Sequence, residues 1–123
     1  MMLSREQILG ATDRKQETVP VEAWGGEVIL TALSLGDRTI IEADFVRLGK
    51  LEIGSPERVT GMRDLQVRMV AMSISDTSGA PLFTLDDVAE LSKKSSEAIG
   101  LLADAATVLN GFAAKAVEDQ AKN

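Results

Sequence analysis

The 123-residue chain contains neither cysteine nor histidine. Without cysteine there is no disulfide framework, thiolate nucleophile or zinc–cysteine site. Without histidine the chain lacks the commonest general base and the commonest metal ligand. Carboxylates, lysines and hydroxyls remain, but no sequence pattern pairs one of them with the partner that an activated nucleophile needs. We therefore expect a protein that is not an enzyme and that holds no cofactor and no metal.

Aromatic residues and long apolar runs are also scarce. Three phenylalanines, one tryptophan and no tyrosine leave aliphatic side chains and methionine to build the core. No apolar run approaches the roughly 20 residues that span a bilayer, and the first residues lack the pattern of a signal peptide. The 13 basic and 19 acidic residues give a net charge of −6, which repels nucleic-acid phosphates. We expect a cytoplasmic protein that binds neither membranes nor nucleic acids.

The length and the 45% of hydrophobic residues suit a single domain with its own core. The sequence pattern predicts the α+β class, with an N-terminal β-hairpin packed with about five α-helices and a mostly helical C-terminal half. The predicted parts of the domain 1–123 are a capped short helix within 1–15, a hairpin over 16–33, a helical region over 34–112 and a frayed tail over 113–123.

The hairpin is predicted from alternating apolar residues and paired glycines. Val19 and Val21 share one face of the first strand, and Pro20 between them cannot donate to a neighbouring strand, so this strand should lie at a sheet edge. Gly25 and Gly26 supply the tight connection to a second strand. A lone hairpin is only marginally stable in water, so helices or another chain must cover it.

Helix starts are marked by hydroxyl side chains that can cap exposed backbone N–H groups. Ser4 with Gln7 forms a capping box for a short helix near 5–11. The later caps are Ser34, Ser55, Thr84, and Ser95 or Ser96, and they begin predicted helices over 35–48, 56–75, 85–93 and 96–110.

The helix predicted over 35–48 carries more apolar residues than a narrow stripe requires. Its main stripe is Ile41, Phe45 and Leu48, at helical spacing. Three further residues, Ile40, Ala43 and Val46, are expected to widen the face that packs on the core.

Three methionines, Met62, Met69 and Met72, share one face of the helix predicted over 56–75. Methionine adapts to irregular partners and is common on binding surfaces. It also fills ordinary cores, and aromatic residues are short here. The pattern favours the core, with a client-binding face as the alternative.

The helix over 96–112 carries two adjacent apolar stripes. One runs through Ile99 and Leu102, and the second through Leu101, Val108 and Phe112. Either the second stripe packs on another subunit or client, or the helix is central in the core. We expect self-association through the second stripe.

Trp24, beside the paired glycines, is a candidate anchor for a partner at the hairpin tip. The alternative, which the need for cover favours, is that the indole folds back as a lid over the helices. The carboxylates of Asp86, Asp87 and Glu90, much later in the chain, are interpreted as stabilising a helix N-terminus rather than binding a cation.

The order of these motifs resembles the tail assembly chaperones of long-tailed bacteriophages and prophages. Three stretches carry the resemblance: Val19–Val28 with its tryptophan and paired glycines, Asp64–Thr84 with its helix and turn, and Asp87–Gly111 with its capped helices. The charged end, Ala116–Asn123, is also similar to the family. Together they cover most of residues 17–123.

The resemblance implies a non-catalytic assembly factor that binds the tape measure protein in the host cytoplasm. Such a factor keeps that protein soluble while tail tube subunits polymerise around it, and it is absent from the mature virion. In many members a frameshifted longer form recruits the tail tube protein. The competing interpretation is a structural virion protein, such as a head–tail connector or tail terminator subunit.

Overall fold

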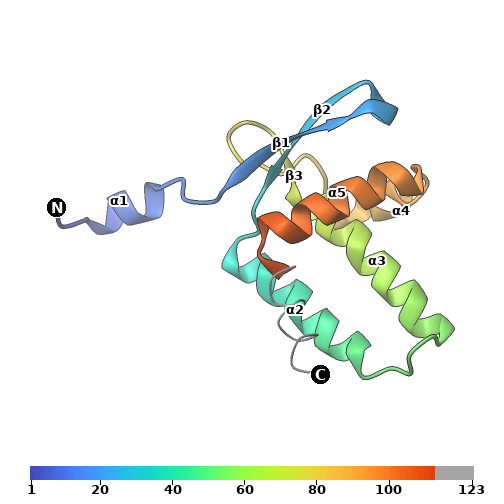
Figure 1. The fold of residues 1–123 in the computed structure, drawn as a ribbon. Helices are drawn as coiled ribbons and strands as arrows, with labels where there is room; N and C mark the ends of the chain where they lie inside the picture. The colour runs from blue at the N-terminus through green and yellow to red at the C-terminus, as the bar shows by residue number, and fades with distance from the viewer. Residues whose placement is uncertain (113–123) are drawn as a thin grey trace.

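The chain folds into a three-stranded antiparallel sheet and a set of helices, of which the last long helix packs against the first strand (Figure 1). The computed structural model describes residues 1–112. This architecture confirms the predicted α+β class. The elements in chain order are α1 (Arg5–Gly10), β1 (Gln16–Val21), a 3-10 turn η1 (Glu22–Trp24), β2 (Gly26–Thr31), α2 (Leu35–Gly49), α3 (Pro56–Ser73), β3 (Ile74–Ser75), a second 3-10 turn η2 (Leu85–Asp87), α4 (Val88–Leu91) and α5 (Ser96–Leu109).

The predicted hairpin is present as β1 and β2, which pair with Val19 opposite Val28 and Pro20 opposite Glu27. The strand order β1-β2-β3 leaves β1 at the edge, so Pro20 lies where a missing N–H donor is tolerated. Gly25 adopts a left-handed conformation with φ 71° after η1. A residue with a side chain rarely adopts that conformation, which explains the glycine at this position.

The third strand was not predicted from the sequence. The helix expected to reach residue 75 ends at Ser73, and the next two residues, Ile74 and Ser75, pair with Leu30 and Ile29 of β2. Ile74 becomes fully buried in this arrangement. The strand pairing and the burial of Ile74 together stabilise the chain more than extending the helix by two residues would.

The helix predicted over 85–93 is shorter and begins differently. Thr84 caps the 3-10 turn η2 rather than an α-helix, and the four-residue helix α4 follows it. The side chain of Asp87 accepts a hydrogen bond from the backbone N–H of Thr84 at 2.8 Å. This reciprocal cap gives Asp87 a structural role, in agreement with the interpretation of the local carboxylates.

The core lies between the sheet and the helices α2, α3 and α5. Helix α3 is central, since it contacts α2, α4 and α5. The fully buried side chains come from every layer, and the largest of them are Leu30, Ile41, Leu48, Leu65, Val70, Ile74 and Leu102. Because the large buried residues are aliphatic, the core is built as the scarcity of aromatic residues requires.

Helices α2 and α3 form an antiparallel pair that extends away from the sheet (Figure 1). They approach closely at Gly61, where an added Cβ would overlap the Cδ2 atom of Leu48. Arg68 of α3 bridges the same pair, because its guanidinium donates to the carboxylate of Asp44 in α2. That hydrogen bond lowers the pKa of Asp44 below its ordinary value of 3.8.

Helix α1 agrees with the predicted short helix but stands apart from the rest of the molecule (Figure 1). Its capping box is formed, with the Ser4 hydroxyl accepting from the Gln7 N–H at 3.2 Å and the Gln7 side chain accepting from the Ser4 N–H at 2.8 Å. None of its residues is buried.

Candidate interaction surface

The two apolar stripes of α5 have different environments. Ser95 caps the helix by accepting a hydrogen bond from the Ala98 N–H at 3.1 Å, which sets the helix start. The inner stripe, through Ile99 and Leu102, is buried in the core. On the outer stripe Leu101 is 45% exposed and Val108 is 67% exposed. The helix is therefore not sealed in the core on all sides.

Phe112 does not lie on the exposed outer stripe with which the sequence grouped it. Helix α5 ends at Leu109, and Gly111 takes a left-handed conformation with φ 77° that turns the chain. The ring of Phe112 is then buried against Phe45 of α2, with the ring centroids 6.0 Å apart in an edge-to-face arrangement. The guanidinium of Arg38 lies 4.4 Å from the Phe112 ring centroid, so Phe112 joins α5 to α2.

Asn110 fixes the same end of α5. Its side-chain oxygen accepts a hydrogen bond from the backbone N–H of Leu33 at 2.7 Å, and its amide donates to the carbonyl of Ala106 at 2.8 Å. Arg38 donates to the backbone carbonyl of Asn110. These bonds tie the helix end to the segment between β2 and α2, and so they hold the outer stripe in place.

The three methionines divide between core and boundary. Met69 is 3% exposed and belongs to the core. Met62 and Met72 are half-buried and pack against the same core from its margin. This placement agrees with the core interpretation that the sequence favoured, and it leaves only the edges of Met62 and Met72 within reach of a partner.

Trp24 lies between the two alternatives considered for it. The indole is 37% exposed, and it lines a shallow slot with Phe83 and Leu91. Charged side chains complete the slot: Asp87 of η2, Glu90 of α4, and Lys94, which follows α4. Trp24 thus approaches the helical layer as a lid would, yet part of its surface remains available for contact.

Two further apolar surfaces were not predicted from the sequence. On α2 the side chains of Ile40 and Val46, expected to face the core, are exposed, and Leu35 is more exposed still. They point away from the buried Ile41 and Leu48 because a helix of this length presents residues on every side. The other surface is α1. For α2, the sequence contained a signal of this exposure, because the helix has more apolar residues than one buried face can hold.

The described residues were also surveyed for metal sites and membrane spans. Within residues 1–112, no group of three acidic side chains is placed to hold a metal ion. In the same part of the chain, no helix is both long enough and apolar enough to cross a membrane. The described surfaces of α2, α5 and the Trp24 slot are apolar with charged residues at their edges, which suits contact with another chain.

The similarity of this chain to known proteins is found at the level of structure. No protein-family model matches the chain, and no curated protein matches it. Among solved structures, the bacteriophage HK97 tail assembly chaperone is similar, with a TM-score of 0.57 and 20% sequence identity over 85% of this chain and 96% of that one. The chain has the fold of a phage tail assembly chaperone. This agrees with the family that the sequence resembles.

The tail assembly chaperone fold is shared over nearly the whole of the HK97 protein. At 20% identity the similarity is one of fold. It says nothing about the exposed apolar residues of α2 and α5, which are described here for this chain alone.

Proposed function

We propose that this protein is a tail assembly chaperone that acts by binding and not by catalysis. In this proposal it binds the tape measure protein in the cytoplasm of the host bacterium and keeps it soluble during tail morphogenesis. It also helps to recruit tail tube subunits, through a frameshifted longer form where one exists, and it is absent from the mature virion. The fold shared with the HK97 chaperone is the observation that supports this most directly.

The uncovered apolar surface supports the same proposal on physical grounds. Leu101 and Val108 on α5, with Ile40 and Val46 on α2, expose apolar area that water disfavours. A long client chain can touch many copies of such a surface at once. Several weak contacts along one client then give a high overall affinity without any single tight site. Trp24 and the edges of Met62 and Met72 are further proposed contacts.

Co-expression with the tape measure protein of the same phage or prophage tests the proposal. We expect the tape measure protein to become soluble and to co-purify with this chain. The double variant Leu101→Glu/Val108→Glu should lose most of the co-purification, whereas Thr60→Glu, an exposed change on α3, should retain it. If the tape measure protein gains no solubility and does not co-purify, the proposal is wrong.

The competing function, a structural virion protein, makes a different prediction. Mass spectrometry of purified particles should then find this chain in stoichiometric amounts. A chaperone should be absent from the same particles while present in the infected-cell lysate.

A further inference from the structure

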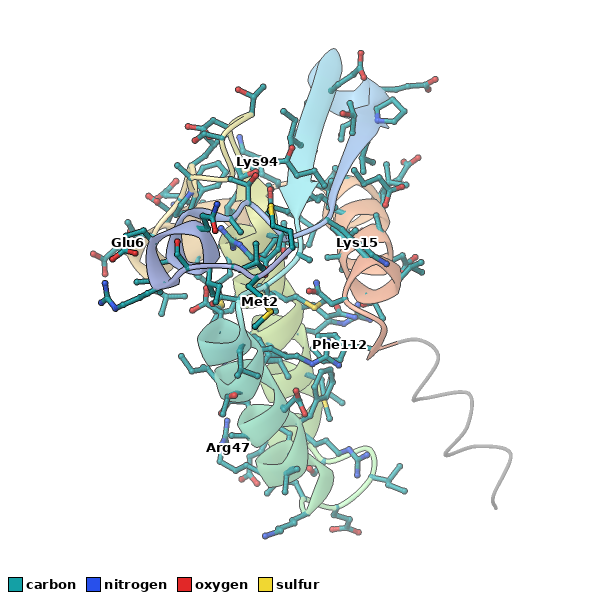
Figure 2. The ribbon with its side chains drawn as sticks, turned by 90° about the vertical axis from the view of Figure 1, so that its left-hand side faces the viewer. Met2, Glu6, Lys15, Arg47, Lys94 and Phe112 are labelled. Atoms are coloured by element: carbon teal, nitrogen blue, oxygen red, sulfur yellow. The ribbon has the colours of Figure 1, made fainter. Side chains whose placement is uncertain are left out.

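The outer edge of β1 carries backbone hydrogen-bonding groups for which the described part of the chain provides no neighbouring strand. The sheet order β1-β2-β3 gives β1 a partner on one side only. Figure 2 shows the hairpin rising above the helices, with Lys15 labelled at the base of β1, and Figure 1 shows the same projection from another direction. The outer part of this edge therefore lies where another chain can reach it.

The hydrogen-bond pattern shows which residues of β1 face this edge. The backbone N–H of Ala32 donates to the carbonyl of Lys15 at 2.8 Å, one step before the first pair of the β1–β2 register. Residues of an antiparallel strand alternate between those that bond to the neighbouring strand and those whose N–H and C=O groups point the other way. The residues of β1 that point away from β2 are therefore Gln16, Thr18 and Pro20.

Pro20 agrees with this assignment, because a proline at an outward position removes no hydrogen bond from the sheet. Gln16 and Thr18 keep their N–H groups, and within residues 1–112 neither group donates to a backbone carbonyl outside the strand pairing. The edge thus offers two donors and the three carbonyls of these residues as acceptors. An extended segment that adds to a sheet edge uses groups of this kind.

The charge of the hairpin selects what can add to this edge. The hairpin from Gln16 to Thr31 contains three glutamates and neither lysine nor arginine. Glu17, Glu22 and Glu27 are exposed, and none of them forms an ion pair with another described residue. Glu27 lies opposite Pro20, so the alternation of side chains puts it on the other face of the hairpin from Glu17. A second copy would bring like charges to this edge, whereas lysine or arginine side chains would be attracted to it.

The basic residues near the hairpin lie at its base. Arg14 donates to the backbone carbonyls of Ala32 and Gly79, both at 3.3 Å. Lys15 directly precedes β1. The edge is therefore positive at its base and negative toward its tip, so the basic side chains of an added segment belong beside the tip.

We propose that the edge of β1 binds an extended, basic segment of a partner protein as a fourth strand of the sheet. The backbone of the segment bonds to Gln16, Thr18 and the carbonyl of Pro20, and its lysine or arginine side chains lie near Glu17 and Glu27. Because Pro20 offers no donor, the pairing is short and the charges supply much of the selectivity. This contact uses a different surface from the outer stripe of α5, and it does not depend on the proposed function.

Hydrogen exchange of the full chain, followed by NMR, tests the strand addition residue by residue. In the free protein the N–H groups of Gln16 and Thr18 should exchange at least about tenfold faster than those of Glu17 and Val19, which bond to β2. The probe is a short synthetic peptide of alternating lysine and valine, and its counterpart carries glutamate in place of lysine. At saturation the basic peptide should slow the exchange of Gln16 and Thr18 at least about tenfold, and the acidic peptide should leave it unchanged.

A backbone-blocked form of the basic peptide separates strand addition from charge attraction alone. N-methylation of every residue keeps the lysine charges and removes the N–H groups that would donate to the carbonyls of β1. We expect the blocked peptide to bind at least about tenfold more weakly in fluorescence anisotropy. Equal affinity of the two forms would overturn the proposal, as would binding of the unblocked peptide without protection of Gln16 and Thr18.

Two variants of the protein test the backbone and the charge separately. Thr18→Pro removes one outward donor and leaves the bonds to β2 in place, so it should remain folded and bind the basic peptide more weakly than its control Thr18→Val. Glu17→Gln/Glu27→Gln should also weaken binding, and the loss should shrink as salt is added. The control for that change is Glu52→Gln/Glu57→Gln, which removes two exposed carboxylates away from the hairpin and should bind as the parent does.

Three further outcomes would contradict the proposal. One is acidic peptide that binds as tightly as the basic peptide, and another is a Glu17→Gln/Glu27→Gln variant that binds as its control does. The third is protection of Gln16 and Thr18 that rises with protein concentration without any peptide, which would make a second copy the occupant of the edge. None of these measurements involves the tape measure protein, so a failure here leaves the proposed function standing.

Discussion

Leu101 and Leu102 are neighbours in α5, yet the first is 45% exposed and the second is fully buried. The same contrast divides the whole molecule. The sheet, α3 and the inner stripe of α5 close around one another, whereas α1, the outer side of α2 and the outer stripe of α5 present apolar side chains to solvent. The chain therefore has more apolar side chains than its core buries, and helices α1, α2 and α5 carry several of the exposed ones.

The contrast separates two uses of the same residue types. We call the buried side chains of the sheet, α3 and the inner stripe of α5 the closed part, and the exposed apolar side chains of α1, α2 and the outer stripe of α5 the open part. Replacing side chains of the closed part should lower the free energy of unfolding. Replacing those of the open part should instead change association with other chains, because they contribute little to the fold of a single copy. Each experiment below compares a member of one group with a matched position.

The sharpest comparison is Leu102→Ala against Leu101→Ala. Removing the buried side chain should lower the free energy of unfolding by about 2–5 kcal/mol, because the core loses apolar burial and gains a cavity. Removing the exposed neighbour should change it by no more than ~0.5 kcal/mol. Urea denaturation followed by circular dichroism measures both. Equal losses would show that the outer stripe also belongs to the core of a single copy.

A second comparison uses two helical glycines. In Gly61→Ala the new Cβ meets the buried side chain of Leu48, and the strain should outweigh the gain in helix propensity, for a net loss of about 1 kcal/mol. In Gly100→Ala the new Cβ has no atom within 4 Å beyond its own helix, so stability should rise by up to ~1 kcal/mol. Thermal unfolding of both variants checks the signs. A stabilised Gly61→Ala would mean that α2 and α3 are less tightly packed than described.

The Asp44–Arg68 pair links α2 to the closed part, and its contribution depends on pH. The Arg68 hydrogen bond lowers the pKa of Asp44 in the folded state below 3.8. The contribution is therefore present above the unfolded-state pKa and is lost as pH falls through the folded-state pKa. Denaturation between neutral pH and pH values below about 4 should show a shallower acid loss for Asp44→Asn. Arg68→Gln should produce the same shallower loss, and an unchanged profile in both variants would refute the coupling.

A change in association, with little change in stability, is expected for Leu101→Glu/Val108→Glu. Both side chains are exposed, so the variant should remain folded with an unfolding free energy within about 1 kcal/mol of the parent. Its self-association through the outer stripe should weaken, because the two carboxylates repel a second copy. Light scattering after gel filtration, with Thr60→Glu as control, measures the change in mass. Unfolding of the variant would assign these positions to the core.

Local cap chemistry predicted the starts of α2, α3 and α5 correctly, although Thr84 caps a 3-10 turn instead of an α-helix. Ser34, Ser55 and Ser95 each accept the expected hydrogen bond from a backbone N–H three residues later. The side chain and the N–H groups lie within one turn, so the signal is contained in a few consecutive residues. The edge position of the strand with Pro20 follows from the same kind of local argument.

Features that depend on distant contacts were not predictable. The strand β3 has two residues, too few to show alternation, and it exists because Leu30 and Ile29 lie beside it. Phe112 seemed to continue a helical stripe, but Gly111 turns the chain and the ring packs on Phe45 instead. The predicted tail over 113–123 lies outside the described residues.

The candidate surface was predictable in part. Helical spacing separates Leu101 and Val108 from Leu102 by about 100° around the helix axis. The structure exposes the first two and buries the third, as two adjacent stripes with different environments require. The same spacing could not decide which of the many apolar residues of α2 face inward. In the structure Leu48 faces α3 where the helices approach closely at Gly61, a contact between distant residues that helical spacing does not reveal.

Trp24 is the only tryptophan of the chain, and no tyrosine is present. Its half-open slot beside Phe83 and Leu91 therefore makes the fluorescence emission of the unmodified protein a report on one place. A chain that settles over the slot should exclude water from the indole and shift its emission to shorter wavelength, without any dye or label. The molecule carries its own optical probe at the junction of the hairpin and the helices.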